Sequence, residues 1–192
     1  MLRIVLVRPG ATLFDEAGRI KGSLDFPLSP EGTSQADKTA TELANIPLDI
    51  VYSSPCESAR QTASILAKRC HSKAKTVDCL RNIDHGLWEG KLIDEVKRQQ
   101  PKVYRQYQES PECVCPPGGE TLESAKIRVE KTLNTWLKKH DTGTIAFVIP
   151  EPLASLVKHL LVSSDLGDLW KVECDNGSWE ILQVEPSKVA LT

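Results

Sequence analysis

The apolar residues of this chain form short runs that alternate with longer amphipathic stretches. The short runs predict five strands, at residues 2–7, 50–53, 75–80, 144–149 and 179–184. Between them, apolar residues recur every three or four positions, as on one face of a helix. A helix between two strands returns the chain to the same edge of a sheet, which favours parallel pairing. The pattern therefore predicts an α/β fold, a three-layer αβα sandwich with a mostly parallel sheet.

Two of the expected helices begin at a serine that is followed by proline. Ser29 precedes Pro30, and Ser54 precedes Pro55. Serine can cap the first turn of a helix, and proline suits the first helical position because it lacks an N–H group. Glu57 adds a capping-box pattern after Ser54. We therefore predict the first helix from Pro30 and the second from Pro55.

The second half of the chain predicts two further helices and one excursion. Residues 120–140 carry an apolar stripe that indicates a core-facing helix, and the last helix follows Pro152. Residues 90–119 are charged first and then rich in proline and glycine. We expect them to form an excursion with one or two helices over the carboxyl edge of the sheet, within a single domain that spans residues 1–192.

The composition excludes several classes of function. The chain has 192 residues, of which 40% are hydrophobic, and its net charge is -2, with 24 basic and 26 acidic residues. Because these charges are mixed along the sequence, we expect no nucleic-acid partner and no membrane partner. The sequence shows no apolar signal segment, which predicts a cytoplasmic protein. Symmetric dimers are common among soluble folds of this size, so a homodimer remains an option.

The six cysteines do not form a recognisable metal or disulfide pattern. They are scattered, which predicts reduced thiols. Cys113 and Cys115 form the one close pair. This pair lacks the two-residue gap and the second pair of ligands that a zinc site requires. We therefore predict no metal and no other cofactor.

Six blocks of the sequence, taken in order, resemble one protein family. They read LVRPGATLFDEAGRIKGSLDFPLSPEGTSQA, VYSSPCESARQTASILA, LRNIDHGLWEGK, PPGGETLE, IAFVIPEP and CDNGSWEIL. Together they resemble the histidine phosphatase superfamily, whose fold is phosphoglycerate mutase-like. The resemblance implies phosphoryl transfer from phosphate esters to a histidine, without a metal.

Four positions that carry the family's chemistry hold unsuitable residues here. The resemblance places the nucleophilic histidine at Pro9 and a second arginine at Ser58. It places the acid that protonates the leaving group at Asn82, and a second histidine at Pro150. A proline ring cannot attack phosphorus, and an amide cannot give up a proton at a useful pH. Arg60 is two residues along the helix from Ser58 and is expected to face solvent instead.

Arg8 is the one family position that survives, and it raises an electrostatic problem. A buried guanidinium without an anion costs several kcal/mol, so Arg8 should find a partner. Asp15, which replaces a family asparagine, and Glu151 are the candidates, and both add negative charge to the site. We expect one of them to reach Arg8. The alternative is that Arg8 points into solvent and Glu151 caps the last helix.

Other nucleophiles are weaker candidates. His85 lies in the IDHGLWEG turn near Asn82, where the family commonly has a bulky ring for packing. Cys56 stands at the head of the second helix, where a thiol pKa can fall. The remaining histidines, His71, His140 and His159, fit structural roles at or within helices.

The sequence therefore favours a family member that has lost its chemistry and kept its scaffold. Its turn and capping residues match the family, while the substitutions gather in the expected pocket of Arg8, Pro9, Asp15, Ser58, Asn82, Pro150 and Glu151. We predict a pseudophosphatase with no catalytic residues at these positions, whose partner is an unidentified protein or small ligand. The alternatives are an active phosphomonoesterase or mutase with an unorthodox nucleophile, and a small-molecule binder at the altered pocket.

Overall fold

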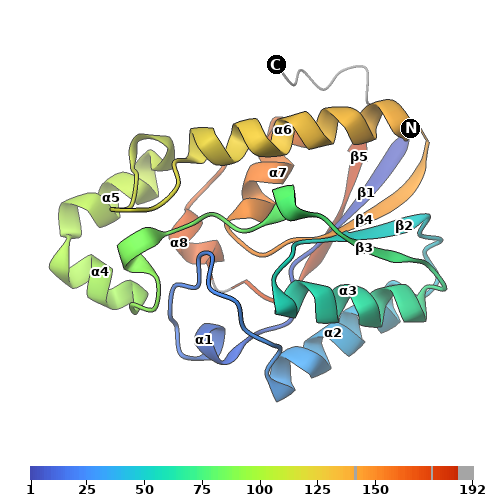
Figure 1. Cartoon of the computed structure of the whole chain (residues 1–192), viewed down its shortest axis with the longest axis horizontal. Coiled ribbons are helices and arrows are strands. Elements are labelled where there is room, and N and C mark those ends of the chain that lie inside the picture. Colours follow the sequence, from blue (N-terminus) through green and yellow to red (C-terminus); the bar gives the residue numbers. More distant parts are fainter. Residues whose placement is uncertain (141, 174, 186–192) are drawn as a thin grey trace.

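The computed structural model describes residues 1–140, 142–173 and 175–185. Its strands form one sheet of five in the order β3-β2-β4-β1-β5 (Figure 1). The first four strands are parallel, and β5 runs antiparallel to β1. This confirms the α/β prediction with a mostly parallel sheet. The strands are β1 (Leu2–Val7), β2 (Ile50–Ser53), β3 (Ala74–Thr76), β4 (Gly143–Val148) and β5 (Trp179–Val184).

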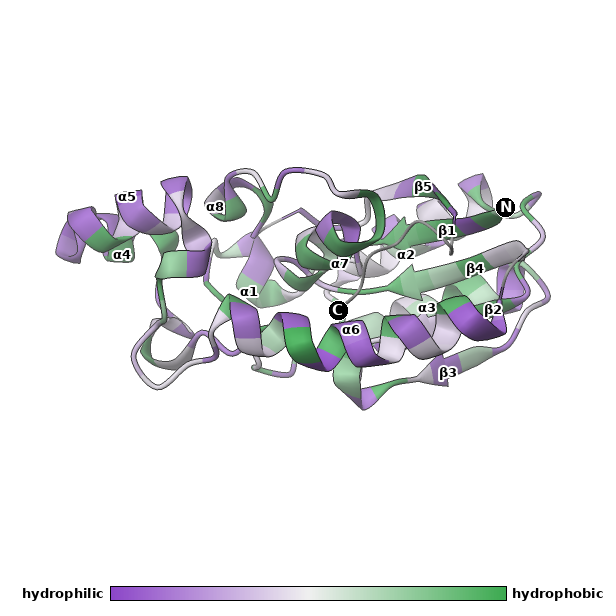
Figure 2. Ribbon diagram, turned by 90° about the horizontal axis from the view of Figure 1, so that it is seen from above, coloured by the Kyte–Doolittle hydropathy of each residue, from purple (hydrophilic) through white to green (hydrophobic). Residues whose placement is uncertain are grey.

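Helices cover both faces of the sheet and make the three layers (Figures 1 and 2). One face packs against α2 and α3, and the other against α6 and α7. Side chains of β1 alternate between these two cores: Ile4 and Leu6 belong to the α6–α7 side, and Val5 and Val7 to the α2–α3 side. The helices are α1 (Leu13–Glu16), α2 (Pro30–Glu42), α3 (Glu57–Arg69), α4 (Ile93–Gln99), α5 (Pro101–Glu109), α6 (Leu122–Lys139), α7 (Leu153–Val162) and α8 (Leu169–Val172).

The third predicted strand is only half right. The strand ends at Thr76, and residues 78–80 form a single turn of 3-10 helix in which Leu80 N donates to Val77 O over 3.0 Å. Strand β3 lies at the sheet edge and its three residues are exposed. The apolar side chain of Leu80 reaches the core only after the chain has turned away from that edge.

The predicted start of the first helix is confirmed, and that of the second is wrong. Ser29 Oγ accepts from Gly32 N over 2.9 Å at the start of α2. Helix α3 begins at Glu57, not at Pro55, and the Ser54 hydroxyl has no partner among the described residues. Ser54 N donates to Val148 O over 2.9 Å, which keeps Ser54 in line with β2.

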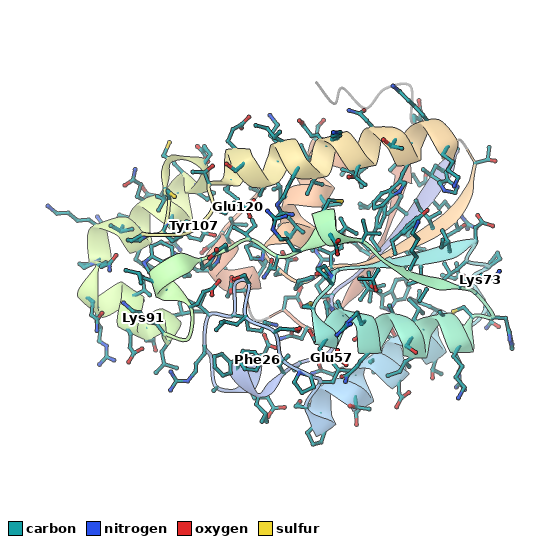
Figure 3. The ribbon with its side chains drawn as sticks, in the orientation of Figure 1. Phe26, Glu57, Lys73, Lys91, Tyr107 and Glu120 are labelled. Carbon is teal, nitrogen blue, oxygen red and sulfur yellow. The ribbon has the colours of Figure 1, made fainter. Side chains whose placement is uncertain are left out.

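The cap of α3 comes from a segment distant in sequence. Asp25 Oδ1 accepts from Glu57 N over 2.6 Å, and Ser58 N donates to Phe26 O over 3.1 Å. Figure 3 shows Phe26 and Glu57 close together at this end of α3. A tertiary contact thus replaces the local capping box that the sequence suggested.

Short helices and the excursion complete the fold. Helices α1 and α8, of four residues each, were not predicted, and the short chain segments that form them carry too few residues to show a helical period. The excursion holds α4 and α5, which lie beyond the end of the sheet and pack near α8 (Figures 1 and 2). No helix in the described part of the chain is both long and apolar enough to cross a bilayer.

Candidate functional site

Residues of the candidate site lie at the carboxyl edge of the sheet. Arg8 follows β1, Pro150 and Glu151 follow β4, and Ser54 follows β2. Ile149 N donates to Val7 O over 2.9 Å, so the ends of β1 and β4 remain aligned. Parallel strands end together at one edge, where α/β folds place their binding sites. Residues far apart in sequence therefore come within side-chain reach of one another.

Arg8 is held in an ion network formed by the chain itself. Its Nε donates to Glu151 Oε1 over 2.8 Å, and its Nη1 donates to Glu180 Oε1 over 2.7 Å. Lys158 Nζ lies 2.7 Å from Glu180 Oε2. The network joins two cations to two anions, so Arg8 is neutralised. The prediction that a carboxylate reaches Arg8 is confirmed, and its partner among the two candidates is Glu151.

Glu151 has a second role at the start of α7. Its Oε2 accepts from Ser155 N over 3.0 Å, while Arg8 is only 7% exposed. The alternative that leaves Arg8 in solvent is therefore wrong, although Glu151 does cap α7. Burial raises the pKa of Glu151, with Arg8 and Ser155 acting against that rise. Burial also disfavours the charged form of Arg8, but Glu151 and Glu180 more than offset this and raise the pKa of Arg8.

Glu180 and Lys158 were not found from the sequence. They lie on β5 and α7, and only the antiparallel pairing of β5 with β1 brings Glu180 to Arg8. Burial alone would raise the pKa of Glu180, but hydrogen bonds from Lys158 and Arg8 bring the pKa below its ordinary value. No motif marks either residue, because charged side chains are common both on edge strands, where Glu180 lies, and on helix surfaces, where Lys158 lies.

Asn82 ties three segments of backbone together. Its Nδ2 donates to Gly22 O over 3.0 Å and to Glu151 O over 2.9 Å, and its Oδ1 accepts from Leu153 N over 3.4 Å. An ionised carboxylate only accepts hydrogen bonds, so it would face two carbonyl oxygens in this position. The surroundings of Asn82 therefore suit an amide and disfavour an ionised acid.

Asp15 is neutralised by a residue other than Arg8. Lys21 Nζ lies 2.6 Å from Asp15 Oδ1 and donates to Oδ2 over 2.8 Å. Thr12 adds hydrogen bonds to Asp15 Oδ2 from its backbone N (2.7 Å) and its hydroxyl (2.8 Å). The negative charge expected from Asp15 is therefore balanced within the site. Lys21 was also not found from the sequence.

Three of the seven expected pocket residues line one almost closed cavity, and the other four, Arg8, Pro9, Asp15 and Glu151, do not line it. Ser58, Asn82 and Pro150 line this cavity together with Thr12 and Lys21, and its volume is about 10 Å³. Such a volume holds about one water molecule. A neighbouring cavity of about 170 Å³ shares three lining residues with it and extends the site outward; the shared residues are Gly22, Cys56 and Asn82.

Pro9 is buried next to Arg8 in the sequence, and backbone hydrogen bonds hold its segment in place. Its carbonyl accepts from Gly177 N over 2.9 Å, and the next residue, Gly10, donates to Thr62 Oγ1 over 3.1 Å. A Cβ atom on Gly10 would lie 2.0 Å from Gly32 O, so the chain needs glycine there. This segment is fixed by its neighbours and does not line the small cavity.

The alternative nucleophiles differ in their access to the site. His85 is 0% exposed and packs edge-on against Trp88 and Tyr107, with its Nε2 3.4 Å from Glu173 Oε2. It lies in the core, as a packing role predicts. Cys56 borders both cavities, and its Sγ lies 3.7 Å from Ser58 Oγ.

The remaining polar candidates have structural surroundings. His140 is the C-cap residue of α6, and His71 follows the C-cap of α3. His159 Nδ1 lies 2.5 Å from Ser164 O. Arg60 is exposed, as predicted, and it pairs with Glu57. The five described cysteines, Cys56, Cys70, Cys79, Cys113 and Cys115, are free thiols.

Comparison with known proteins gives a consistent family match. Residues 4–192 match the model of the histidine phosphatase superfamily (branch 1). Phosphoserine phosphatase 1 of Hydrogenobacter thermophilus is 34% identical over 185 residues, which cover 96% of this chain and 88% of that protein. Putative phosphoserine phosphatase 2 of the same organism is 28% identical, over 100% of this chain and 94% of that protein.

Solved structures show the same fold. Bacillus stearothermophilus YhfR has a TM-score of 0.83 at 23% identity, over 100% of this chain and 96% of that chain. A mycobacterial glucosyl-3-phosphoglycerate phosphatase in complex with VO3 has a TM-score of 0.82 at 22% identity, over 94% of this chain and 90% of that chain. At such identities the likeness concerns the fold alone.

Proposed function

Since the chain belongs to the histidine phosphatase superfamily, we propose that it is a catalytically inactive member, a pseudophosphatase, that keeps the fold for a binding or scaffold role. The observation that carries the proposal is the ion pair between Arg8 and Glu151, at 2.8 Å. A guanidinium expected to hold substrate phosphate is bonded instead to a carboxylate of its own chain. Glu151 thereby occupies the place of an anionic ligand.

The closed cavity supports the same proposal. The cavity of about 10 Å³ beside Asn82 does not extend to Arg8 or Glu151, which are both buried. A phosphate ester would have to displace the Glu151 carboxylate to reach Arg8. Separating a buried ion pair leaves one charge without a partner, which costs several kcal/mol. Phosphate binding at Arg8 would thus begin with a large unfavourable rearrangement.

The chemistry of the site gives a third line of support. Pro9 has no group that can accept a phosphoryl group, and the Asn82 amide, engaged with backbone atoms, cannot act as a proton source. Each lost catalytic or electrostatic contribution costs roughly two to four powers of ten in rate. Loss of the nucleophile removes the usual path altogether.

An active phosphomonoesterase is the second candidate, and the names of the relatives favour it. One relative that is 34% identical is a phosphoserine phosphatase by name. In this chain the nucleophile would have to be Cys56, which borders both cavities, because His85 has no exposed surface. A third candidate, a small-molecule binder, is favoured by the cavity of about 170 Å³, which is lined in part by Arg81.

A phosphatase assay separates the first two candidates. The purified full chain is incubated with a chromogenic phosphomonoester and with O-phosphoserine, beside its Cys56→Ser and Arg8→Ala variants. We expect all three proteins to show only background turnover, and mass spectrometry to find no phosphoryl adduct. Turnover by the unmodified chain that falls in either variant would establish an active phosphatase. Activity that is equal in all three proteins would point to a contaminant.

A ligand screen tests the third candidate. Melting curves recorded with small carboxylates, alcohols and phosphates should show no stabilisation that depends on Arg81. A ligand at 100 times its Kd raises the free energy of unfolding by about 2.7 kcal/mol, which a melting curve resolves. A rise that disappears in Arg81→Ala would assign a small-molecule role to the outer cavity.

A further inference from the structure

A surface groove lies away from the Arg8 site, on the side of α6 and α7. It has a volume of about 490 Å³ and is lined by the end of α5, the start of α6, residues of α7 and the connection between α7 and α8. Figure 1 shows α5, the start of α6 and α8 gathered at the same end of the molecule. This volume lies within the range of ligand-binding clefts.

The floor of the groove is apolar and belongs to the main core. Leu122 and Leu156 are buried, and the half-buried Leu166 packs against the same core cluster. These leucines come from three separate segments, so tertiary packing holds the floor in place. A floor of this kind accepts an apolar side chain and removes it from water, which is favourable in proportion to the area buried.

The rim of the groove is acidic. Glu109, Glu112, Glu123 and Asp165 line it and are exposed. Lys126 is the one lysine or arginine among its described lining residues, and its Nζ lies 4.0 Å from Glu123 Oε2.

Most of these carboxylates form no ion pair within the described residues, and Glu109 also borders a second cavity that is lined by Lys102 and Arg105. Among the described residues, no ion pair involves Glu109, Glu112 or Asp165. The whole chain has a net charge of only -2, so the groove concentrates negative charge locally. Charge of one sign around a cleft attracts ligands of the opposite sign and repels those of the same sign.

We propose that this groove docks a basic segment of a partner protein, which places an aliphatic side chain on the leucine floor and flanking lysines or arginines on the acidic rim. The apolar floor selects the anchor, and the carboxylates select the flanking charge. The proposal does not depend on whether the protein is a pseudophosphatase, because none of the residues in the Arg8 network lines the groove.

Three capped hexapeptides test the proposal with the full-length protein. The first is Lys-Lys-Leu-Leu-Lys-Lys, the second replaces both leucines by serine, and the third replaces all lysines by glutamate. Each is titrated into nitrogen-15-labelled protein and followed by two-dimensional NMR. We expect the first peptide to bind with a Kd below about 1 mM and to shift the amides of residues 108–112, 122–126 and 165–167. The serine and glutamate peptides should bind at least tenfold more weakly.

Protein variants identify the site. Glu112→Gln with Asp165→Asn should weaken binding of the first peptide by about two- to fivefold for each carboxylate removed, and added salt should weaken it further. Glu31→Gln, on exposed surface at the start of α2, is the matched control and should leave the Kd unchanged. Melting temperatures show whether each variant is folded.

Several outcomes would overturn the proposal. These are no saturable binding of the first peptide, equal binding of the serine or glutamate peptide, or amide shifts that lie outside the groove. Equal affinity in the Glu112 and Asp165 variant would likewise refute the role of the rim. Loss of affinity in the Glu31 variant as well would show a general charge effect instead of a site.

Discussion

Replacing Glu151 by alanine removes one of the two carboxylates that bind Arg8 and also the side chain that caps Ser155 N. The two charged side chains are 8% and 0% exposed, so the pair is well buried. Removing one partner of a buried pair costs about 3–5 kcal/mol. Glu180 would still hold Arg8 Nη1, and the raised pKa of Glu151 shows that burial already opposes its charge. We therefore expect the free energy of unfolding to fall by about 2–3 kcal/mol, which lowers the melting temperature by about 5–10 °C.

Chemical denaturation measures this loss, with Glu151→Gln as the matched control. The glutamine oxygen can still accept one hydrogen bond, so the free energy of unfolding of Glu151→Gln should fall by only about 1 kcal/mol. The expected order of stability is the unmodified chain, then the glutamine variant, then the alanine variant. A typical surface substitution changes the free energy of unfolding by no more than about 0.5 kcal/mol. An alanine variant whose loss is no larger than this would refute the electrostatic reasoning.

Phosphate tests the functional meaning of the same substitution. In Glu151→Ala the Nε group of Arg8 loses its partner and should bind inorganic phosphate, while Glu180 still holds Nη1. Phosphate at ten times its Kd raises the free energy of unfolding by about 1.4 kcal/mol. The unmodified chain should not be stabilised, because Glu151 already holds Arg8. Equal stabilisation of both proteins by phosphate would contradict the idea that Glu151 occupies the place of the anion.

Three other substitutions probe the surroundings of the site. Asn82→Asp should destabilise the fold by about 1–3 kcal/mol at pH 7, because the carboxylate would face two carbonyl oxygens; a denaturation midpoint that does not move would argue against this. The pKa of Glu180 lies below its ordinary value of 4.5, so the ionised group stabilises the fold above that pH and this contribution is lost as the pH falls through the folded pKa. The difference in melting temperature between the unmodified chain and Glu180→Gln should therefore shrink from pH 7 to about pH 3, and a constant difference would exclude the linkage. His85→Phe should cost about 1–3 kcal/mol, because it removes the polar group that lies 3.4 Å from the buried Glu173 carboxyl, and adding Glu173→Leu should recover the loss, as measured by denaturation. No recovery would show that this contact is not the cause.

Local sequence patterns predicted the main elements of the fold. The apolar runs at β1, β2 and β5 have the predicted bounds, and the stripe on α6 is buried at most of its positions. These elements can be predicted locally because the pattern of apolar and polar residues in a strand or an amphipathic helix repeats every few residues. The capping of α3 could not be predicted in the same way, since its cap is Asp25, a residue of another segment.

Residue identity alone also decided what the family positions cannot do. A proline at position 9 and an amide at position 82 lack the required nucleophile and acid in any conformation. The sequence even limited the partners of Arg8 to acidic residues, because a buried guanidinium requires an anion. It offered Asp15 and Glu151 without separating them.

Only the tertiary structure decided how the altered site is filled. Arg8 meets Glu151 because β1 and β4 end side by side, and it meets Glu180 because β5 pairs antiparallel with β1. Asp15 turns instead to Lys21. The two ion pairs of Arg8 join side chains that are far apart in sequence, so strand order and register, which no local pattern encodes, determine them.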